Sequence, residues 1–335
     1  MDQIETQRRG GRRGPPPNFV WISSRLSSRS LRLPPSPEAS GDKPRFDEAN
    51  PQLDKRIIQG HPISMPELPE VETTRRGVEP HVVGETIAEV IVRRRDLRQP
   101  VTRGIGAIEG EMVGAVKRRS KYLLFELEGA GHLLIHLGMS GSLRVADPTE
   151  DWRKHDHVAI TLSNGKQLRF HDPRRFGLVL WFKGDPKHHA LLKHLGPEPL
   201  SEAFTADYLK AACAKRSAAI KLVIMDAKVV VGVGNIYASE SLFRAGISPR
   251  IAARRLSKPK LARLVTCIRE VLEQSIQEGG TTLRDFLNSD GTPGYFKQRL
   301  FVYGREAEPC RECQTPIRHA VMGQRATYWC AVCQK

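Results

Sequence analysis

Four cysteines near the end of the chain have the spacing of a metal site. Cys310 and Cys313 form one CxxC pair, Cys330 and Cys333 form another, and sixteen residues separate the two pairs. Two such pairs can surround a tetrahedral Zn²⁺, and because all four ligands would be thiolates, no coordination position is left open for catalysis. The spacing therefore predicts one structural zinc ion in a short β-hairpin, with two disulfides or four free thiols as the alternatives.

The chain carries a large excess of positive charge. Its 335 residues include 53 Lys and Arg against 37 Asp and Glu, which gives a formal net charge of +16 at pH 7. A polyanion is the expected partner, since each neutralised phosphate releases a counterion and adds salt-dependent affinity. Composition indicates a nucleic acid without distinguishing DNA from RNA, and a basic enzyme of another kind is the alternative.

Residues 1–64 differ in amino-acid composition from the rest of the chain. They contain RRGGRRGPPP and SSRLSSRSLRLPPSP with few apolar positions, so we expect a disordered extension. The segment lacks the apolar core of a secretory signal, and its acidic residues weaken its similarity to a transit peptide. A further reading is that translation starts at Met65.

After this extension, the pattern predicts one helix followed by many short strands. Pro69 can occupy the first turn of a helix over residues 69–82, whose acidic start would complement the helix dipole. Asn164-Gly165 is a strong hairpin signal because both residues tolerate positive φ. Closely spaced short strands favour a β-sandwich, and the expected strands are residues 87–93, 112–116, 121–127, 132–137, 157–162, 167–171 and 178–182.

Beyond Leu200, helical periodicity replaces the strands. Apolar residues recur at three- and four-residue steps over residues 261–276, and Gly279-Gly280 would end that helix. Shorter helices are expected at residues 205–214, 218–225 and 236–244. The glycine-rich turn at 232–235 is not a nucleotide-binding P-loop, because no GK[ST] follows it.

Several motifs, all in one order, resemble those of the formamidopyrimidine-DNA glycosylases. The resemblance covers residues 65–335 and has no counterpart in residues 1–64. It begins with MPELPEVETTRRG at Met65. The further motifs are KYLLFEL at 121–127, HLGMSGSL at 136–143, DPRRFG at 172–177, VVGVGNIYASESLF at 230–243, GGTTLRDFLNSDGTPGYF at 279–296 and QRAT at 324–327 in the four-cysteine finger.

The resemblance implies that the residues after Met65 carry the reaction. In the family the initiator methionine is removed, so Pro66 would be N-terminal, and its secondary amine would attack C1′ of the damaged nucleotide and form a Schiff base. Glu67 would be the general acid, since a carboxyl among apolar neighbours can keep its proton near neutral pH. Glu70 resembles a supporting carboxylate. Without the other motifs, Pro66 would be read as a proline that only begins a helix.

The resemblance also implies a set of residues that contact DNA. Lys121 and Arg325 match residues that bind phosphates around the lesion, and both belong to the expected catalytic set. Lys221 matches a lysine near the damaged base, and Asn235 matches a phosphate-contacting asparagine of a helix-two-turns-helix module. The complete expected DNA-binding set is His155, His157, Arg174, Lys221 and Asn235.

Flipping a base out of the duplex leaves a void that costs a few kcal/mol unless it is filled. Met139, Arg174 and Phe176 match the residues that fill this void in the family. Met and Phe can wedge into the base stack, while Arg offers donors to the orphaned base. Arg284 and Tyr295, in the segment 284–296 that is rich in Gly, Asn and Ser, match contacts of a loop that closes on the extruded base. Read without the family, Met139 and Phe176 would be ordinary core residues.

The pattern of expected helices and strands, together with the family resemblance, predicts an α+β, multidomain protein. We expect an N-terminal β-sandwich with flanking helices as the catalytic domain at residues 66–196. A helical helix-two-turns-helix DNA-binding domain should follow at 205–290, and a C-terminal four-cysteine zinc-finger β-hairpin at 305–335. Residues 1–64 would be an extension outside these three domains.

The function implied is that of a bifunctional DNA glycosylase and AP lyase of base excision repair. Such an enzyme removes 8-oxoguanine and formamidopyrimidines from duplex DNA and then nicks the strand by β,δ-elimination. An endonuclease VIII-like glycosylase for oxidised pyrimidines is one alternative, which Leu68 and the separated Met139 and Arg174/Phe176 disfavour. A non-catalytic zinc-finger DNA-binding protein is the other, because an internal Pro66 has an amide nitrogen with no nucleophilic lone pair. We therefore expect the active protein to start at Pro66.

We expect the partner to be damaged double-stranded DNA, bound by a monomer that does not associate with membranes. No uncharged apolar run in the sequence is long enough to span a bilayer. Cys213 and Cys267 lie alone in helix-like segments, which suits a reducing compartment. A cytoplasmic, nucleoid-associated bacterial protein is the expectation, and organellar targeting by residues 1–64 is the weaker alternative.

Overall fold

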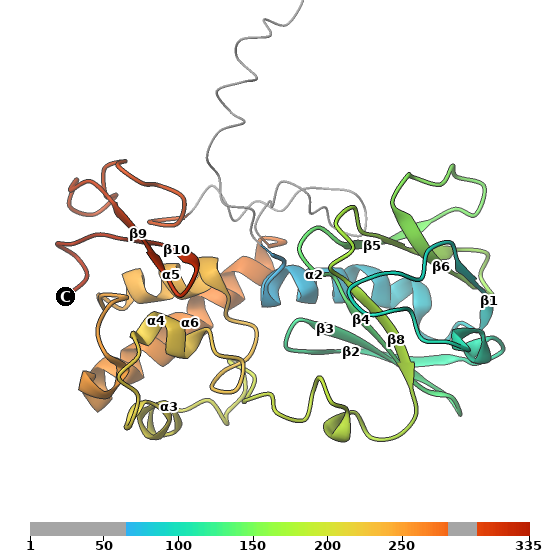
Figure 1. Ribbon diagram of the computed structural model, residues 1–335, viewed down its shortest axis with the longest axis horizontal. Coiled ribbons are helices and arrows are strands. Elements are labelled where there is room, and N and C mark those ends of the chain that lie inside the picture. The colour runs from blue at the N-terminus through green and yellow to red at the C-terminus, as the bar shows by residue number, and fades with distance from the viewer. Residues whose placement is uncertain (1–64, 281–299) are drawn as a thin grey trace, which may run out of the picture. The chain divides into compact units, whose positions relative to one another are not determined.

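The computed structural model describes residues 65–280 and 300–335, and its helices and strands form an α+β fold (Figure 1). The first helix, α2 (Leu68–Val82), begins within one residue of the predicted start, with Pro69 in its first turn. The backbone N–H of Glu67, which precedes the helix, donates to Oε2 of Glu70 at 2.8 Å. This bond satisfies a donor that would otherwise be unpaired at the helix start.

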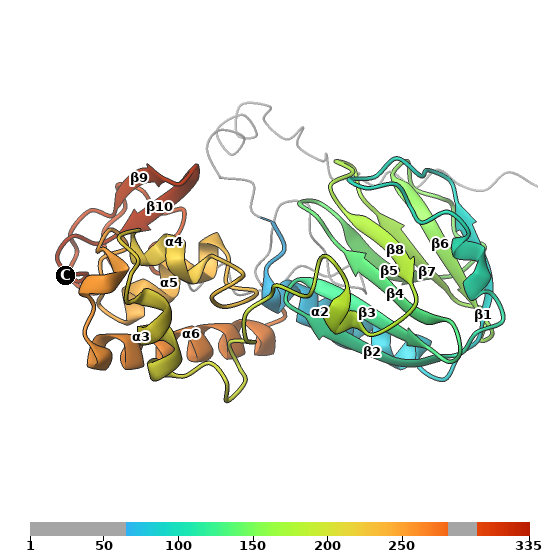
Figure 2. The ribbon, with the colours of Figure 1, turned by 60° about the horizontal axis from the view of Figure 1, so that its bottom comes forward.

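Two four-stranded antiparallel sheets follow α2 and lie face to face (Figure 2). The first sheet has the order β1 (Ile87–Val92), β6 (Asp156–Leu162), β7 (Gln167–His171) and β5 (Ser142–Ala146). The second has the order β2 (Val113–Arg119), β3 (Tyr122–Leu127), β4 (Gly131–His136) and β8 (Leu178–Phe182). The predicted β-sandwich is therefore confirmed.

Alternating apolar side chains from both sheets fill the interior of the sandwich. Phe125 and Leu133 from the second sheet face Ile160 and Leu168 from the first, and all four are buried around one small apolar void. Side chains one residue apart point to opposite faces of a strand, which explains the period of two in these segments. Burying each such side chain stabilises the fold by about 1.5–3 kcal/mol. The sandwich thus gives its connecting loops a rigid base.

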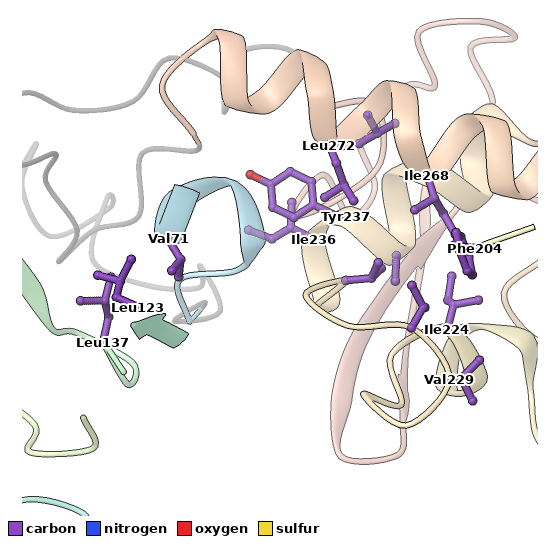
Figure 3. Packing of buried hydrophobic residues seen from close by; sticks show 14 of the residues in the cluster. Val71, Leu123, Leu137, Phe204, Ile224, Val229, Ile236, Tyr237, Ile268 and Leu272 are labelled. Carbon is purple, nitrogen blue, oxygen red and sulfur yellow. The ribbon is translucent and has the colours of Figure 1, made fainter. Parts of the chain in front are cut away.

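Helices make up the next part of the chain. They are α3 (Ala206–Cys213), α4 (Ile220–Ile224), α5 (Asn235–Arg244) and α6 (Lys258–Gln277), with short 3₁₀ turns η1 (Ile105–Ile108), η2 (Pro186–His188) and η3 (Ala253–Arg255) elsewhere. Ile236 and Tyr237 of α5 lie in one apolar cluster with Ile268 and Leu272 of α6 (Figure 3). The four helices predicted after Leu200 are confirmed.

The chain ends in a β-hairpin of β9 (Arg318–Met322) and β10 (Arg325–Trp329), in which Arg325 pairs with Met322 beside the turn. The hairpin lies between the two CxxC pairs, as predicted. One strand, β5, was not expected from the sequence, because only Leu143 and Val145 signal it and so short an alternation is ambiguous. Among the described residues, no helix is both long and apolar enough to cross a membrane.

Candidate active site

The carboxylate of Glu67 is bound to the N-terminus of helix α5. Gly234 N donates to Glu67 Oε2 at 2.8 Å, and Ile236 N donates to Glu67 Oε1 at 3.0 Å. The backbone of the next residue is also tied to this turn, since Leu68 N donates to Gly232 O at 3.1 Å. The first N–H groups of a helix lack partners within it and favour a carboxylate at this place. Pro66, directly before Glu67, is buried.

Burial raises the pKa of Glu67 to about 7. Within this value, the charge of Glu70 acts in the same direction as burial, while the positive charge of Lys121 and the backbone N–H groups of Ile236 and Tyr237 act in the opposite direction. The side chain is almost completely buried. A carboxyl group with a pKa near neutrality can hold a proton and release it, as a general acid must.

Glu70, in helix α2, is hydrogen-bonded to the backbone of Glu67. Its Oε2 accepts the backbone N–H of Glu67, and its Oε1 accepts the hydroxyl of Tyr237 at 2.6 Å. That hydroxyl also lies 2.6 Å from Oγ of Ser275 on α6. Glu70 therefore joins α2 to α5 and α6.

Lys121 lies in the two-residue turn that joins β2 to β3, and its charge acts on Glu67. The turn requires a left-handed backbone at Ser120, with φ of 59°. Glu198 holds it: Oε1 accepts Ser120 N at 2.7 Å, and the carboxylate pairs with Arg118 and Arg119 at 2.7 and 2.8 Å. Glu198 was not singled out in the sequence, because it lies outside every recognised motif.

His136 adds a neutral imidazole beside Lys121. Burial, together with the charges of Lys121 and Arg98, lowers the pKa of His136 to about 4. Its Nδ1 accepts the N–H of Gly138 at 2.9 Å, so the ring proton is on Nε2. His136 was missed in the sequence although it is the first residue of the HLGMSGSL motif.

Lys221 is directed at the finger hairpin. Its Nζ is buried and donates to Ala326 O at 2.9 Å and to Thr327 Oγ1 at 2.8 Å, both on β10. Burial lowers the pKa of Lys221 to about 7; the charge of Glu67 raises it and that of Arg325 lowers it. Arg325 itself is exposed at the start of β10. Lys221 therefore connects the helical part of the site to the strand that carries Arg325.

Asn235 is the first residue of α5, one position after Gly234. Its Nδ2 makes a long bond of 3.4 Å to the hydroxyl of Tyr303, and within residues 65–280 and 300–335 its buried Oδ1 has no hydrogen-bond partner. The side-chain amide thus has unused hydrogen-bonding capacity at the start of α5. Arg284 and Tyr295, expected in the loop that closes on the base, lie outside the described residues.

The structure brings the three expected void-filling residues onto two adjoining loops. Met139 is half-buried in the β4–β5 loop, and Arg174 and the exposed Phe176 lie in the β7–β8 loop. The Arg174 guanidinium carbon lies 5.2 Å from the centre of the Phe176 ring, within the range of a cation–π contact. A Cβ on Gly138 would lie only 2.5 Å from the backbone of Phe176, so the two loops touch directly.

The two expected DNA-binding histidines differ in their surroundings. His157 is buried, and its Nε2 lies 2.8 Å from the carbonyl oxygen of Asp172. His155 is half-buried, and its ring centre lies 6.2 Å from that of His157 and 5.8 Å from that of His171. Burial and the neighbouring charges lower the pKa of His155. His155 is the more accessible of the two.

The four cysteines of the finger converge on one point. Their sulfur atoms all lie within 4.8 Å of one another, with Cys310 Sγ 3.9 Å from Cys333 Sγ and Cys313 Sγ 3.4 Å from Cys330 Sγ. Tetrahedral Zn²⁺ with Zn–S bonds of about 2.3 Å separates its sulfurs by roughly 3.8 Å. The cluster therefore fits a zinc ion, and none of the four forms a disulfide.

Buried Glu240 of α5 ties the start of the finger region to the helices. Its carboxylate accepts the backbone N–H groups of Phe301, Val302 and Tyr303 at 2.8, 3.0 and 2.8 Å. Burial raises the pKa of Glu240. This residue lies within the VVGVGNIYASESLF motif but was not singled out there.

Comparison with known families accounts for nearly all of the described chain. The Formamidopyrimidine-DNA glycosylase N-terminal domain matches residues 65–179, its H2TH domain matches residues 195–287, and the zinc finger found in FPG and IleRS matches residues 307–335. The chain belongs to the formamidopyrimidine-DNA glycosylase family. Among curated members of this family, the Cronobacter sakazakii protein is 58% identical over 271 residues and the Xanthomonas campestris protein (strain 8004) 56% over 272. Each alignment covers 81% of this chain and all of the relative.

Solved structures of the family share the fold. The MutM (Fpg) protein from Thermus thermophilus is 42% identical, with a TM-score of 0.73 over 80% of this chain and 98% of that one. The Lactococcus lactis FPG (MutM) protein, solved in complex with DNA containing Fapy-dG, is 32% identical, with a TM-score of 0.73 over 80% of this chain and all of that one. The family thus includes proteins with this fold that bind damaged DNA.

Proposed function

We propose that this protein is a bifunctional DNA glycosylase and AP lyase that removes oxidised purines from duplex DNA. One observation carries the proposal: the carboxyl group next to Pro66 is buried, is held by the N-terminus of α5 and has a pKa of about 7. Family membership supports it, as do solved relatives bound to DNA containing Fapy-dG or carbocyclic 8-oxo-G. The substrates we propose are 8-oxoguanine and formamidopyrimidines.

The reaction starts at the nitrogen of Pro66. Its lone pair attacks C1′ of the damaged nucleotide while the bond from C1′ to the base breaks. The nitrogen loses its N–H proton, and the departing base takes up a proton. Protonated Glu67 gives its proton to the ring oxygen O4′, which opens the sugar and lets the nitrogen form an iminium at C1′. The iminium acidifies the C2′ proton, whose loss expels the 3′ phosphate, and a second elimination expels the 5′ phosphate. One amine thereby serves both activities.

This chemistry requires a chain that starts at Pro66. Within the printed sequence the nitrogen of Pro66 is acylated by Met65, and an amide nitrogen has no basic lone pair for attack. We propose that translation from Met65, or removal of the preceding residues, followed by loss of the methionine, produces the active form. A protein that retains residues 1–64 would bind DNA without cutting it.

Several side chains would contact the DNA backbone around the flipped nucleotide. Lys121 supplies positive charge that acts on Glu67, Arg325 supplies positive charge that acts on Lys221, and Asn235 supplies an amide at the start of α5. Of His155 and His157, His155 is the one that is exposed enough to reach a phosphate. We assign His157 and Lys221 an indirect role, because each is buried and hydrogen-bonded within the protein.

Met139, Arg174 and Phe176 would enter the duplex where the damaged base leaves it. Two apolar side chains can replace lost stacking, and a guanidinium can hydrogen-bond the orphaned base. The four cysteines of the finger would hold one zinc ion. With four thiolate ligands the metal stabilises the fold of the hairpin that carries Arg325 and takes no part in the reaction.

Substrate preference tests the proposal. A chain that starts at Met65 is incubated in excess with one of two duplexes, which carry either 8-oxoguanine opposite cytosine or thymine glycol opposite adenine. Strand cleavage is then followed in a single turnover. We expect faster cleavage of the 8-oxoguanine duplex, and we expect Glu67→Gln to slow excision from it by about a hundredfold or more. Preferred cleavage at thymine glycol would instead indicate an endonuclease VIII-like enzyme.

A further inference from the structure

Asp172, the first residue of the DPRRFG motif, has a completely buried side chain that joins two loops. Its Oδ1 accepts the hydroxyl of Ser140 in the β4–β5 loop at 3.1 Å. Its Oδ2 accepts the backbone N–H of Gly177 in the β7–β8 loop at 2.8 Å. One carboxylate therefore connects the loop that carries Met139 to the loop that carries Arg174 and Phe176.

The backbone of Asp172 adds a third loop to this junction. Its carbonyl oxygen lies 2.8 Å from Nε2 of His157, and its N–H donates to the carbonyl of His155 at 3.0 Å. Both histidines belong to the segment that enters strand β6. Asp172 is thus hydrogen-bonded to the β4–β5 loop, to the rest of its own β7–β8 loop and to the start of β6, three of the segments of the sandwich for which a DNA contact is expected.

Asp172 also shapes its own loop. Residues 172–175 form a turn closed by a 3.2 Å bond from Arg175 N to Asp172 O, with Asp and Pro at the positions that such turns favour. Arg175 follows in a left-handed conformation, with φ of 58°, which costs a non-glycine residue about 1–2 kcal/mol. Ser140 Oγ, held by Asp172, accepts the N–H of Arg174 at 3.3 Å. A strained turn persists only where its surroundings determine it.

We propose that Asp172 is a positioning residue that fixes Met139, Arg174 and Phe176 relative to one another. None of its polar atoms needs to touch DNA, since its whole effect passes through the loops it joins. Because Arg174 would read the base left opposite the flipped nucleotide, Asp172 would set the preference for that base. The inference rests on the proposed void-filling role of these three residues.

Fluorescence of the orphaned base tests this without requiring catalysis. The full chain is bound to a duplex with a tetrahydrofuran abasic analogue opposite 2-aminopurine, whose emission reports whether side chains enter the stack. We expect Asp172→Ala to lose most of the emission change while its affinity falls by less than about threefold, because phosphate contacts supply most of the binding. Asp172→Asn should retain the signal, since its amide can still accept from Gly177 and donate to Ser140.

Asp156→Ala is the matched control for loss of a buried carboxylate. Asp156 is equally buried and pairs with Arg144 and His171, but it has no bond to either void-filling loop. We expect it to lower the thermal midpoint without changing the 2-aminopurine signal. If Asp172→Ala does not fold, Ser140→Ala removes one arm of the junction and should lose part of the signal.

A second readout uses a chain that starts at Met65 and compares excision of 8-oxoguanine opposite cytosine and opposite adenine. Asp172→Ala should bring the ratio of the two rates toward one, with at least about a tenfold loss on the cytosine duplex. Wild-type emission and a wild-type ratio in Asp172→Ala would overturn the inference. If the unmodified protein cuts neither duplex but its emission change depends on Asp172, the proposed function fails and the positioning role stands.

Discussion

A Cβ atom added to Gly234 would lie 2.2 Å from Cδ of Glu67 and 2.4 and 2.5 Å from its two carboxyl oxygens. The backbone at Gly234, with φ of −104° and ψ of −155°, is open to any residue, so glycine is required here for space and not for flexibility. The carboxyl of Glu67 thus occupies the volume in which a side chain of residue 234 would lie. The start of α5 and the proposed general acid fit together only because that side chain is absent.

Replacing Gly234 by alanine should therefore disable the chemistry more than the fold. The new methyl group would push the Glu67 carboxyl away from Gly234 N and Ile236 N, and a misplaced general acid costs about 10²–10⁴-fold in rate. Gly106→Ala is the control, since a Cβ there meets nothing closer than 3.8 Å. We expect a loss of excision of at least about a hundredfold in single-turnover assays for Gly234→Ala only. Equal excision rates for Gly234→Ala and Gly106→Ala would contradict the conclusion that the Glu67 carboxyl needs the space left by the missing side chain at position 234.

The pH dependence of excision should report Glu67. Burial raises its pKa to about 7. The acid form is the active one, so the rate should fall by about tenfold per pH unit well above 7. The Pro66 amine must be unprotonated to attack C1′, so its protonation would produce an opposing limb in the profile. In Glu67→Gln we expect a rate lower by about a hundredfold or more and no descending alkaline limb. A wild-type profile that keeps rising between pH 7 and 9 would rule out Glu67 as the acid.

Lys221 should act through Arg325. Lys221→Met removes the donor that binds Ala326 O and Thr327 Oγ1 on β10. We expect weaker binding to damaged duplex for this variant and for Arg325→Ala, and a double variant no weaker than the worse single one, because residues in one network are not additive. Lys228→Met removes the same charge from an exposed position and should change affinity little. Full additivity in titrations at one salt concentration would show that Lys221 acts independently.

Metal analysis tests the finger. One zinc per chain should be found by mass spectrometry of the purified protein, and chelation should weaken DNA binding because the hairpin that carries Arg325 loses its support. Cys313→Ser should lower both the zinc content and the affinity for DNA. An intact mass lower by four hydrogens, with no metal, would show two disulfides in place of the zinc site.

Much of this fold could be predicted from local pattern. The helix that begins near Pro69, the hairpin at Asn164-Gly165 and the amphipathic helix that ends before Gly279 are each set by short-range chemistry. The four-cysteine metal site could also be predicted, because its ligands have a characteristic CxxC spacing. The motifs also named Pro66, Glu67 and Lys121, and the structure shows that the charge of Lys121 acts on Glu67.

Contacts between distant segments could not be predicted in the same way. Glu198 holds the Lys121 turn from 78 residues away, as Ser120 N and Glu198 Oε1 show, and no local pattern marks it. Lys221 bonds to a strand more than 100 residues later, so its ammonium faces the finger, a direction the sequence does not indicate. Asp172 was recognised only as part of a motif, because its role depends on loops that meet in the folded protein.

The central claim is that the nitrogen of Pro66 forms the covalent bond to DNA, and its most direct test is to map that bond. A chain that starts at Met65 is reacted with an 8-oxoguanine duplex and borohydride, and the trapped peptide is sequenced by mass spectrometry. We predict that the initiator methionine is absent and that deoxyribose is attached to the nitrogen of Pro66, whereas the chain that keeps residues 1–64 is not trapped. Attachment to a lysine such as Lys121, or trapping of the longer chain with its Pro66 still acylated, would contradict the account.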